Sequence, residues 1–175
     1  MANPTMTLIS SQTLGGTTAS VTFSSIPSTY NDLKLVVSAR GSSLNQVISF
    51  QIAFNGDATT NYSYTRLLGN SSTAASTRVS TTALDYGAQM DAANATASTF
   101  GSCEIYIPNY TSTGSKPFID IDVSEQNDAT AGNSAIASVA HLYRGASGIS
   151  SITLTPSSGN FVQYSSFYLY GIKNS

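Results

Sequence analysis

The residues best suited to chemistry are four acidic side chains in one short stretch, Asp120, Asp122, Glu125 and Asp128. Asp120 and Asp122 lie two residues apart in an alternating segment, which predicts that both carboxylates share one strand face, about 7 Å apart. Such a pair could bind Ca²⁺ with help from loop carbonyls, or act as the acid pair of a glycosidase. The interpretation that we favour is a solvated face or ion pairs with nearby basic residues, the candidates being Lys116, Arg144 and Lys173.

The chain has one histidine and one cysteine, which leaves few other reactive groups. His141 lies in an alternating segment opposite Leu142, and we expect a half-exposed strand residue there. Cys103 lies in an apolar alternating segment typical of a buried thiol, and a single cysteine excludes a disulfide within the chain. No metalloprotease, nucleophile-elbow or phosphate-loop motif is present. We therefore assign no catalytic residue, no metal and no cofactor, with Asp120 and Asp122 as the one alternative for calcium.

Tyrosine is the more informative residue type, with ten copies and no tryptophan. Tyr62 and Tyr64 share one strand face, and so do Tyr168 and Tyr170. Tyrosine offers a rigid contact area with a polar tip, which suits partner interfaces and surfaces that stack on sugars. These four residues are the candidates for a partner interface; the alternative is that they fill the core or the strand surfaces.

Alternation of apolar and polar residues with a period of two runs through the chain and predicts strands. The clearest example is Ile48, Phe50, Ile52 and Phe54, followed by a turn of hairpin type at residues 55–57. About nine or ten short strands are expected, and no helix of ten residues is convincing. This pattern predicts an all-β fold, an antiparallel two-sheet β-sandwich of the jelly-roll kind.

The organisation along the chain is that of one domain. Residues 1–15 are expected to form an extended N-terminal arm or the first strand, and residues 16–175 a single β-sandwich domain. The low-complexity stretch 69–79 (GNSSTAASTRV) is interpreted as a surface loop, and residues 80–97 as strand, loop or one short helical turn.

Composition excludes some functions. Charged residues make up 9% of the chain, the net charge is −2, and no basic cluster is present. Nucleic-acid binding relies on clustered Lys and Arg, so we expect no such partner. The N-terminal residues lack a signal-peptide pattern, and no apolar run reaches the roughly 20 residues that span a bilayer. We expect a soluble protein made in a host cytoplasm, with no membrane partner.

Three stretches together carry a family resemblance: IPSTYNDLKLVVSARGS (26–42), FQIAFNGDATTNYSYTRLLG (50–69) and ITLTPSSGNFVQYSSFYLYGI (152–172). They resemble a small β-sandwich virion protein of tailed bacteriophages, of head decoration (cement) or fibre type. The matching features are an entry strand, an N-x-D hairpin with a following N-Y pair, and a closing LYGI strand. The residues that match are Tyr30, Leu33, Asn55, Asp57, Asn61, Tyr62 and Leu169 through Ile172.

The resemblance implies a structural protein without catalytic residues. It implies a capsid decoration protein, located on the virion surface, that binds and stabilises the lattice of the major capsid protein. We expect a homo-oligomer, with a trimer favoured. The first alternative is a tail-fibre or receptor-binding module that recognises host glycans. The second is a carbohydrate-active enzyme that uses Asp120 and Asp122.

Overall fold

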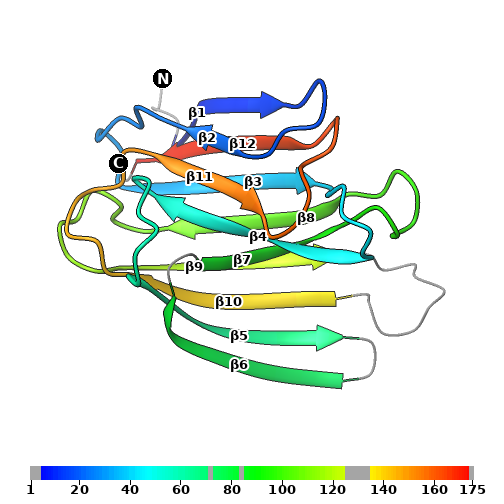
Figure 1. Ribbon diagram of the computed structural model, residues 1–175. Helices are drawn as coiled ribbons and strands as arrows, with labels where there is room; N and C mark the ends of the chain where they lie inside the picture. Colours follow the sequence, from blue (N-terminus) through cyan, green and yellow to red (C-terminus); the bar gives the residue numbers. More distant parts are fainter. Residues whose placement is uncertain (1–4, 71–72, 83–84, 125–134, 174–175) are drawn as a thin grey trace.

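The computed structural model describes residues 5–70, 73–82, 85–124 and 135–173, which form twelve β-strands and no helix (Figure 1). The expected all-β fold is confirmed, with twelve strands rather than nine or ten. The strands are β1 (Met6–Thr13), β2 (Val21–Phe23), β3 (Asp32–Ala39), β4 (Val47–Phe54), β5 (Tyr62–Asn70), β6 (Thr73–Thr82), β7 (Asp85–Asp91), β8 (Gly101–Ile107), β9 (Lys116–Ser124), β10 (Ala135–Tyr143), β11 (Ile152–Pro156) and β12 (Ser166–Ile172).

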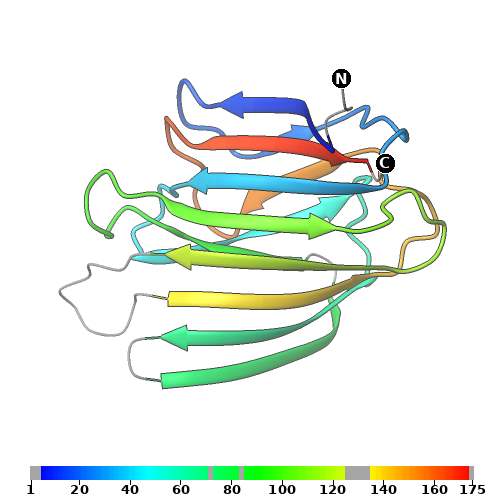
Figure 2. The same ribbon diagram turned by 180° about the vertical axis from the view of Figure 1, so that it is seen from behind.

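The strands form two antiparallel sheets that pack face to face. The large sheet has eight strands in the order β1-β12-β3-β8-β9-β10-β5-β6, and the small sheet has four in the order β2-β11-β4-β7. The outer face of the large sheet is turned toward the viewer in Figure 2. The expected antiparallel two-sheet sandwich is therefore confirmed.

Eight of the strands are paired in the manner of a jelly roll. The first four strands pair with later strands in reverse order, as β1 with β12, β2 with β11, β3 with β8 and β4 with β7. This is a long hairpin rolled up into two sheets, the arrangement of a jelly roll. We call these eight strands the jelly-roll core.

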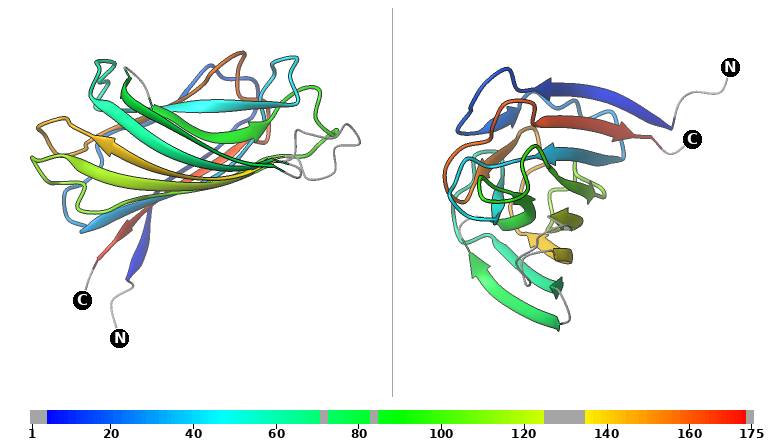
Figure 3. Two further views of the ribbon diagram at one scale, coloured as in Figure 1. Left: turned by 90° about the horizontal axis from the view of Figure 1, so that it is seen from below. Right: turned by 90° about the vertical axis from the view of Figure 1, so that its right-hand side faces the viewer.

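The remaining four strands, β5, β6, β9 and β10, are two hairpins inserted into the jelly roll, and we call them the extension. They continue the large sheet from β8 to its edge at β6. Figure 3 shows that β5 and β6 lie beyond the small sheet, whose last strand on this side is β7. The small sheet therefore covers the jelly-roll strands of the large sheet and, through β7, also packs on β9 and β10 of the extension, whereas β5 and β6 extend past it.

Alternating side chains build the centre of the jelly-roll core. β4 has the burial alternation expected of a half-buried strand, with Phe50 and Phe54 fully buried. Phe161 lies between the sheets, its ring centroid 5.0 Å from that of Phe167 and 6.3 Å from that of Phe50. Such aromatic contacts add to the stabilisation from burial. The small sheet thus covers an apolar inner face.

The low-complexity stretch 69–79 is not a loop, and this prediction was wrong. Its described residues end β5 and form most of β6, with the pairs Gly69–Ala74 and Leu67–Ser76. Thr and Val favour a pleated strand, and the less favourable Ala residues are held in the strand because β5 supplies the backbone hydrogen bonds. Residues 80–97, left open by the sequence, contain β7. At the N-terminus β1 lies within the stretch 1–15, for which an arm or a first strand was expected.

The turn at residues 55–57 has the expected conformation but a different role. Asn55 and Gly56 have φ values of +53° and +69°, the left-handed region that Asn and Gly tolerate. The turn does not close a hairpin, because β4 belongs to the small sheet and β5 to the large one. It carries the chain from the core into the extension.

Candidate functional site

The inner face of the extension gathers charged side chains from three neighbouring strands. The register places Asp120 of β9 between Ile105 of β8 and Val139 of β10. Asp122 lies in the same way between Cys103 and Ala137. All these side chains are buried. Two carboxylates are therefore enclosed among apolar neighbours.

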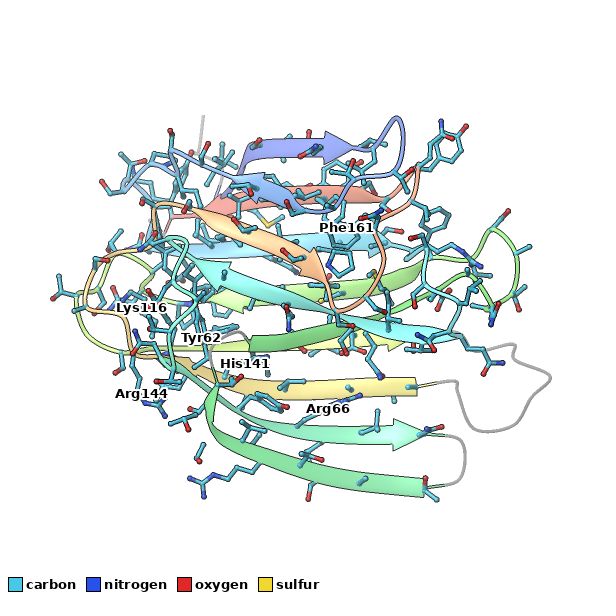
Figure 4. All side chains as sticks on the ribbon, in the orientation of Figure 1. Tyr62, Arg66, Lys116, His141, Arg144 and Phe161 are labelled. Atoms are coloured by element: carbon cyan, nitrogen blue, oxygen red, sulfur yellow. The ribbon has the colours of Figure 1, made fainter. Side chains whose placement is uncertain are left out.

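Asp120 is paired with His141. The His141 Nε2 and the Asp120 Oδ2 are 2.6 Å apart, and both side chains are at most 1% exposed. The His141 ring stacks on Phe118 at a centroid distance of 4.4 Å and an interplanar angle of 7°. Figure 4 labels His141 on β10 and, on the neighbouring strand β5, Arg66, which lies opposite Val139. A short hydrogen bond of this kind is strong, and charge assists it when the ring is protonated.

These positions correct three sequence predictions. Asp120 and Asp122 do not form a solvated face, and His141 is not half-exposed. Asp120 does have a basic partner, but this partner is His141 rather than Lys116, Arg144 or Lys173. The reason is the direction of alternation in β9, which turns Ile119 and Ile121 outward and the acids inward.

Asp122 has no matching donor. Among the described residues no group makes a hydrogen bond with good geometry to either of its oxygens. Burial, with the repulsion of Asp120, raises the pKa of Asp122 to about 7, although the Gln89 backbone N–H, Arg66 and His141 act to lower it. This carboxyl group therefore changes its protonation state near neutral pH, which is unusual for aspartate.

The acids do not converge into a metal site within the part of the chain that the structure describes. No three His, Cys, Asp or Glu side chains there are grouped so as to hold an ion. Glu125 and Asp128, the other members of the acidic stretch, lie outside the described residues. Cys103 is buried as expected. Burial is the main cause that raises the pKa of its thiol, and the negative charges of Asp120, Asp122 and Glu104 raise this pKa further.

The basic residues proposed as partners act elsewhere. Lys116 is buried and its Nζ donates to the carbonyls of Gly114 and Gly145, each at 2.9 Å. Burial lowers the pKa of Lys116. Arg144 donates to the Ser63 hydroxyl and to the Ser80 carbonyl. Both residues make hydrogen bonds that connect loops and strand ends of the extension.

The four candidate interface tyrosines differ in burial and in the face of the sheet on which they lie. Tyr62 is fully buried and stacks on Tyr143 at 4.9 Å, and its hydroxyl donates to the Asp57 carbonyl. Tyr62 is therefore a core residue and does not present its ring to a partner. Tyr64 is half-buried on the same inner face, 6.2 Å from the His141 ring. Tyr168 and Tyr170 are half-buried on the outer face of β12.

The outer face of the large sheet is unusually apolar. Among the described residues nine large hydrophobic side chains are exposed, and seven of them lie on this face. The seven are Met6, Leu8, Leu67, Tyr106, Ile119, Ile121 and Ile136. Large exposed apolar patches mark interaction sites. The alternation in β9 places Ile119 and Ile121 on one face of the strand, but the sequence alone did not say which face of the strand is exposed.

The patch deepens into an open hollow of about 560 Å³ over the extension. Leu67, Ile121 and Ile136 line it, and Gly69 and Ala74 keep its floor low because they carry no large side chain. This hollow and the apolar residues around it are the best candidate for a binding surface.

Comparisons of the chain with protein-family models, with curated proteins and with solved structures find no match. Because the described residues contain no helix, none of their segments is a helix able to cross a membrane.

Proposed function

We propose that this chain is a non-enzymatic structural protein of a tailed-phage virion, a capsid decoration protein that binds the major capsid protein. The observation that carries the proposal is the apolar outer face of the large sheet, with its hollow between β9, β10, β5 and β6. The resemblance of the IPSTY, NGDATTNY and LYGI stretches to phage virion proteins supplies the class of partner.

The inner-face chemistry supports a structural rather than an enzymatic function. The His141–Asp120 pair is closed off by Phe118 and by the neighbouring strands, and neither side chain is more than 1% exposed. A general base must reach its substrate within hydrogen-bond distance. A buried pair of this kind contributes to the structure of the extension instead.

The weak charge of the chain fits a lattice partner. With 9% charged residues, the protein has little long-range electrostatic steering. Many copies on a symmetric shell gain strength from avidity, so that each contact need not be tight. The homotrimer expected from the resemblance stays a prediction.

The direct test uses capsids stripped of this protein and reconstituted with purified chain. Ile121→Lys places a charge on the β9 side of the hollow and should weaken binding by at least about tenfold, or 1.4 kcal/mol. Thr22→Lys puts the same charge on the exposed face of the small sheet and should leave binding unchanged.

Two results would reject the proposal. One is a reconstruction of the parent particle in which this chain is missing from the capsid surface. The other is Ile121→Lys and wild type occupying stripped capsids equally, with circular dichroism showing that both are folded.

A receptor-binding module is the second candidate, and Tyr168 and Tyr170 are the observation that favours it. They lie two residues apart on the outer face, next to Lys34 and Val36 of β3, in the spacing that stacks successive sugar rings. Glycan-array binding that disappears in Tyr168→Ala but persists in Ile121→Lys would favour this function over capsid decoration.

A further inference from the structure

The extension ends in an open strand. Among the residues that the structure describes, β6 is the last strand of the large sheet, and its ladder with β5 uses only one side of its backbone. Residues Thr73 through Arg78 are all exposed. An edge of this kind presents unpaired N–H and C=O groups, whose natural complement is another extended strand.

The two edges of the large sheet differ in how far they are protected. β1 has an irregular register between Leu8 and Ser10, and bulges of this kind discourage pairing of edges. β6 runs in regular register from Thr73 to Val79 and contains no proline and no lysine there. Its irregularity comes only after Val79, where Arg144 donates to the Ser80 carbonyl.

We propose that β6 pairs with β6 of a second copy of this chain, antiparallel about a two-fold axis at Ser76. In this register the regular segment Thr73–Val79 overlaps itself completely, because Thr73 lies opposite Val79 and Ser76 opposite Ser76. Every pair then joins residues of the same sheet face, as antiparallel pairing requires.

Charge favours this register. Arg78 is the only charged residue of β6. It lies opposite Ala74 of the second copy, so the small side chain leaves it room. The two Arg78 side chains are four residues apart along the strand direction, about 13 Å, whereas a pair centred on Arg78 would set like charges directly opposite.

The pairing would make one continuous sheet from two copies. Ala74 and Leu67 line the outer hollow, so the hollows of the two copies would meet across the two-fold axis. A C₂ contact uses the same patch on both subunits and closes without forming fibres. The inference goes beyond capsid binding and yields a dimer, which distinguishes it from the expected trimer.

Cross-linking tests the register. Ser76→Cys sets two thiols opposite each other at the axis, with Cβ atoms about 5 Å apart, and should give a cross-linked dimer with a short thiol-specific linker. Thr73→Cys is the matched control, since its two thiols would be about 20 Å apart and should stay unlinked. The native Cys103 is buried. Cross-linking at position 73 instead of 76 would overturn the register.

Charge substitution tests the interface. In sedimentation velocity at about 100 μM, wild type should be a dimer, and Ser76→Lys should weaken dimerisation by at least about tenfold because two ammonium groups meet. Ser11→Lys puts the same charge on β1 and should leave the dimer intact. A monomeric or trimeric wild type, or a dimer lost in Ser11→Lys alone, contradicts the proposal. Capsid binding is measured separately, so either proposal can fail without the other.

Discussion

The large sheet has two parts whose inner faces differ in chemistry. In the jelly-roll core the inner face of the large sheet is apolar, with Leu33, Leu35 and Phe167 fully buried. In the extension the inner face carries Asp120 and Asp122 together with the buried His141. The strands belong to one continuous sheet, and yet only the extension adds these buried ionisable side chains to its apolar ones, which include Tyr62, Phe118 and Tyr143.

The difference indicates that the residues that stabilise the fold and the residues available for binding lie in different parts of the sheet. Burial of apolar surface is the main stabilising contribution to a fold, and the jelly-roll core provides it. Buried charges cost desolvation that their pairing only partly offsets, so the extension contributes less to stability. Ile119, Ile121, Ile136 and Leu67 face outward instead, where they are available to a partner.

The largest expected effect is a contrast between the two parts. Phe167→Ala removes a fully buried ring packed on Phe161 and should lower the free energy of unfolding by about 4 kcal/mol. Ile121→Thr replaces a residue that is 51% exposed. This substitution should change the free energy of unfolding by no more than about 0.5 kcal/mol. Urea unfolding followed by circular dichroism measures both.

Equal losses in these two variants would contradict the separation. They would mean that the outer face of the extension is covered in the folded chain and contributes to its core.

The buried pair gives the next effect. His141→Ala leaves the Asp120 carboxylate buried without its partner and removes the ring stacked on Phe118. We expect a loss of about 3 kcal/mol in the free energy of unfolding. Replacing both partners, as Asp120→Val with His141→Leu, should recover most of it, because no unpaired charge remains. A double variant no more stable than His141→Ala would show that the pair is not the source of the loss.

Asp122 predicts an unusual dependence on pH. Its pKa is raised from 3.8 to about 7 in the folded chain, so the protonated form favours folding. This contribution is complete below pH 4 and is lost as the pH rises through 7. Between pH 5 and 7.5 the loss is about 2.5 kcal/mol, from about 1.4 kcal/mol per pKa unit. Asp122→Asn should remove this slope and be the more stable form at pH 7.5, as urea unfolding at both pH values will show.

Asp57 supplies a control of opposite sign. Burial raises its pKa in part, but hydrogen bonds from Asn61, Thr59 and Tyr143 outweigh burial and lower the pKa to about 2. Its stabilising contribution is therefore present above pH 4 and lost toward pH 2. If Asp57→Asn and Asp122→Asn shifted the pH profile in the same direction, the assignment of the slope to Asp122 would be wrong.

The sequence predicted the fold class because alternation is a local signal. β4, with Phe50 and Phe54 inward, and the turn at Asn55 were recognisable from neighbouring residues alone. The number of strands was underestimated because β6 has few apolar residues, and its strand state depends on pairing with β5.

The candidate site was less predictable for a physical reason. Alternation separates the two faces of a strand but does not say which face is inside. In β9 the assumption that Ile119 and Ile121 point inward was reasonable, since isoleucine is usually buried and aspartate is not. The contacts that reverse it come from Cys103, Val139 and His141, which lie far away in the sequence.

The smallest expected effect concerns an ion pair on the outer face of the jelly-roll core. Lys34 Nζ and Glu104 Oε2 are 2.8 Å apart, almost as close as Asp120 and His141, but their side chains are 28% and 57% exposed. Water screens an exposed pair and satisfies either partner when the other is removed. Glu104→Gln should therefore change the free energy of unfolding by no more than about 0.5 kcal/mol, and salt should reduce even that. A loss as large as that of His141→Ala would mean that depth in the sheet is not what distinguishes the two pairs.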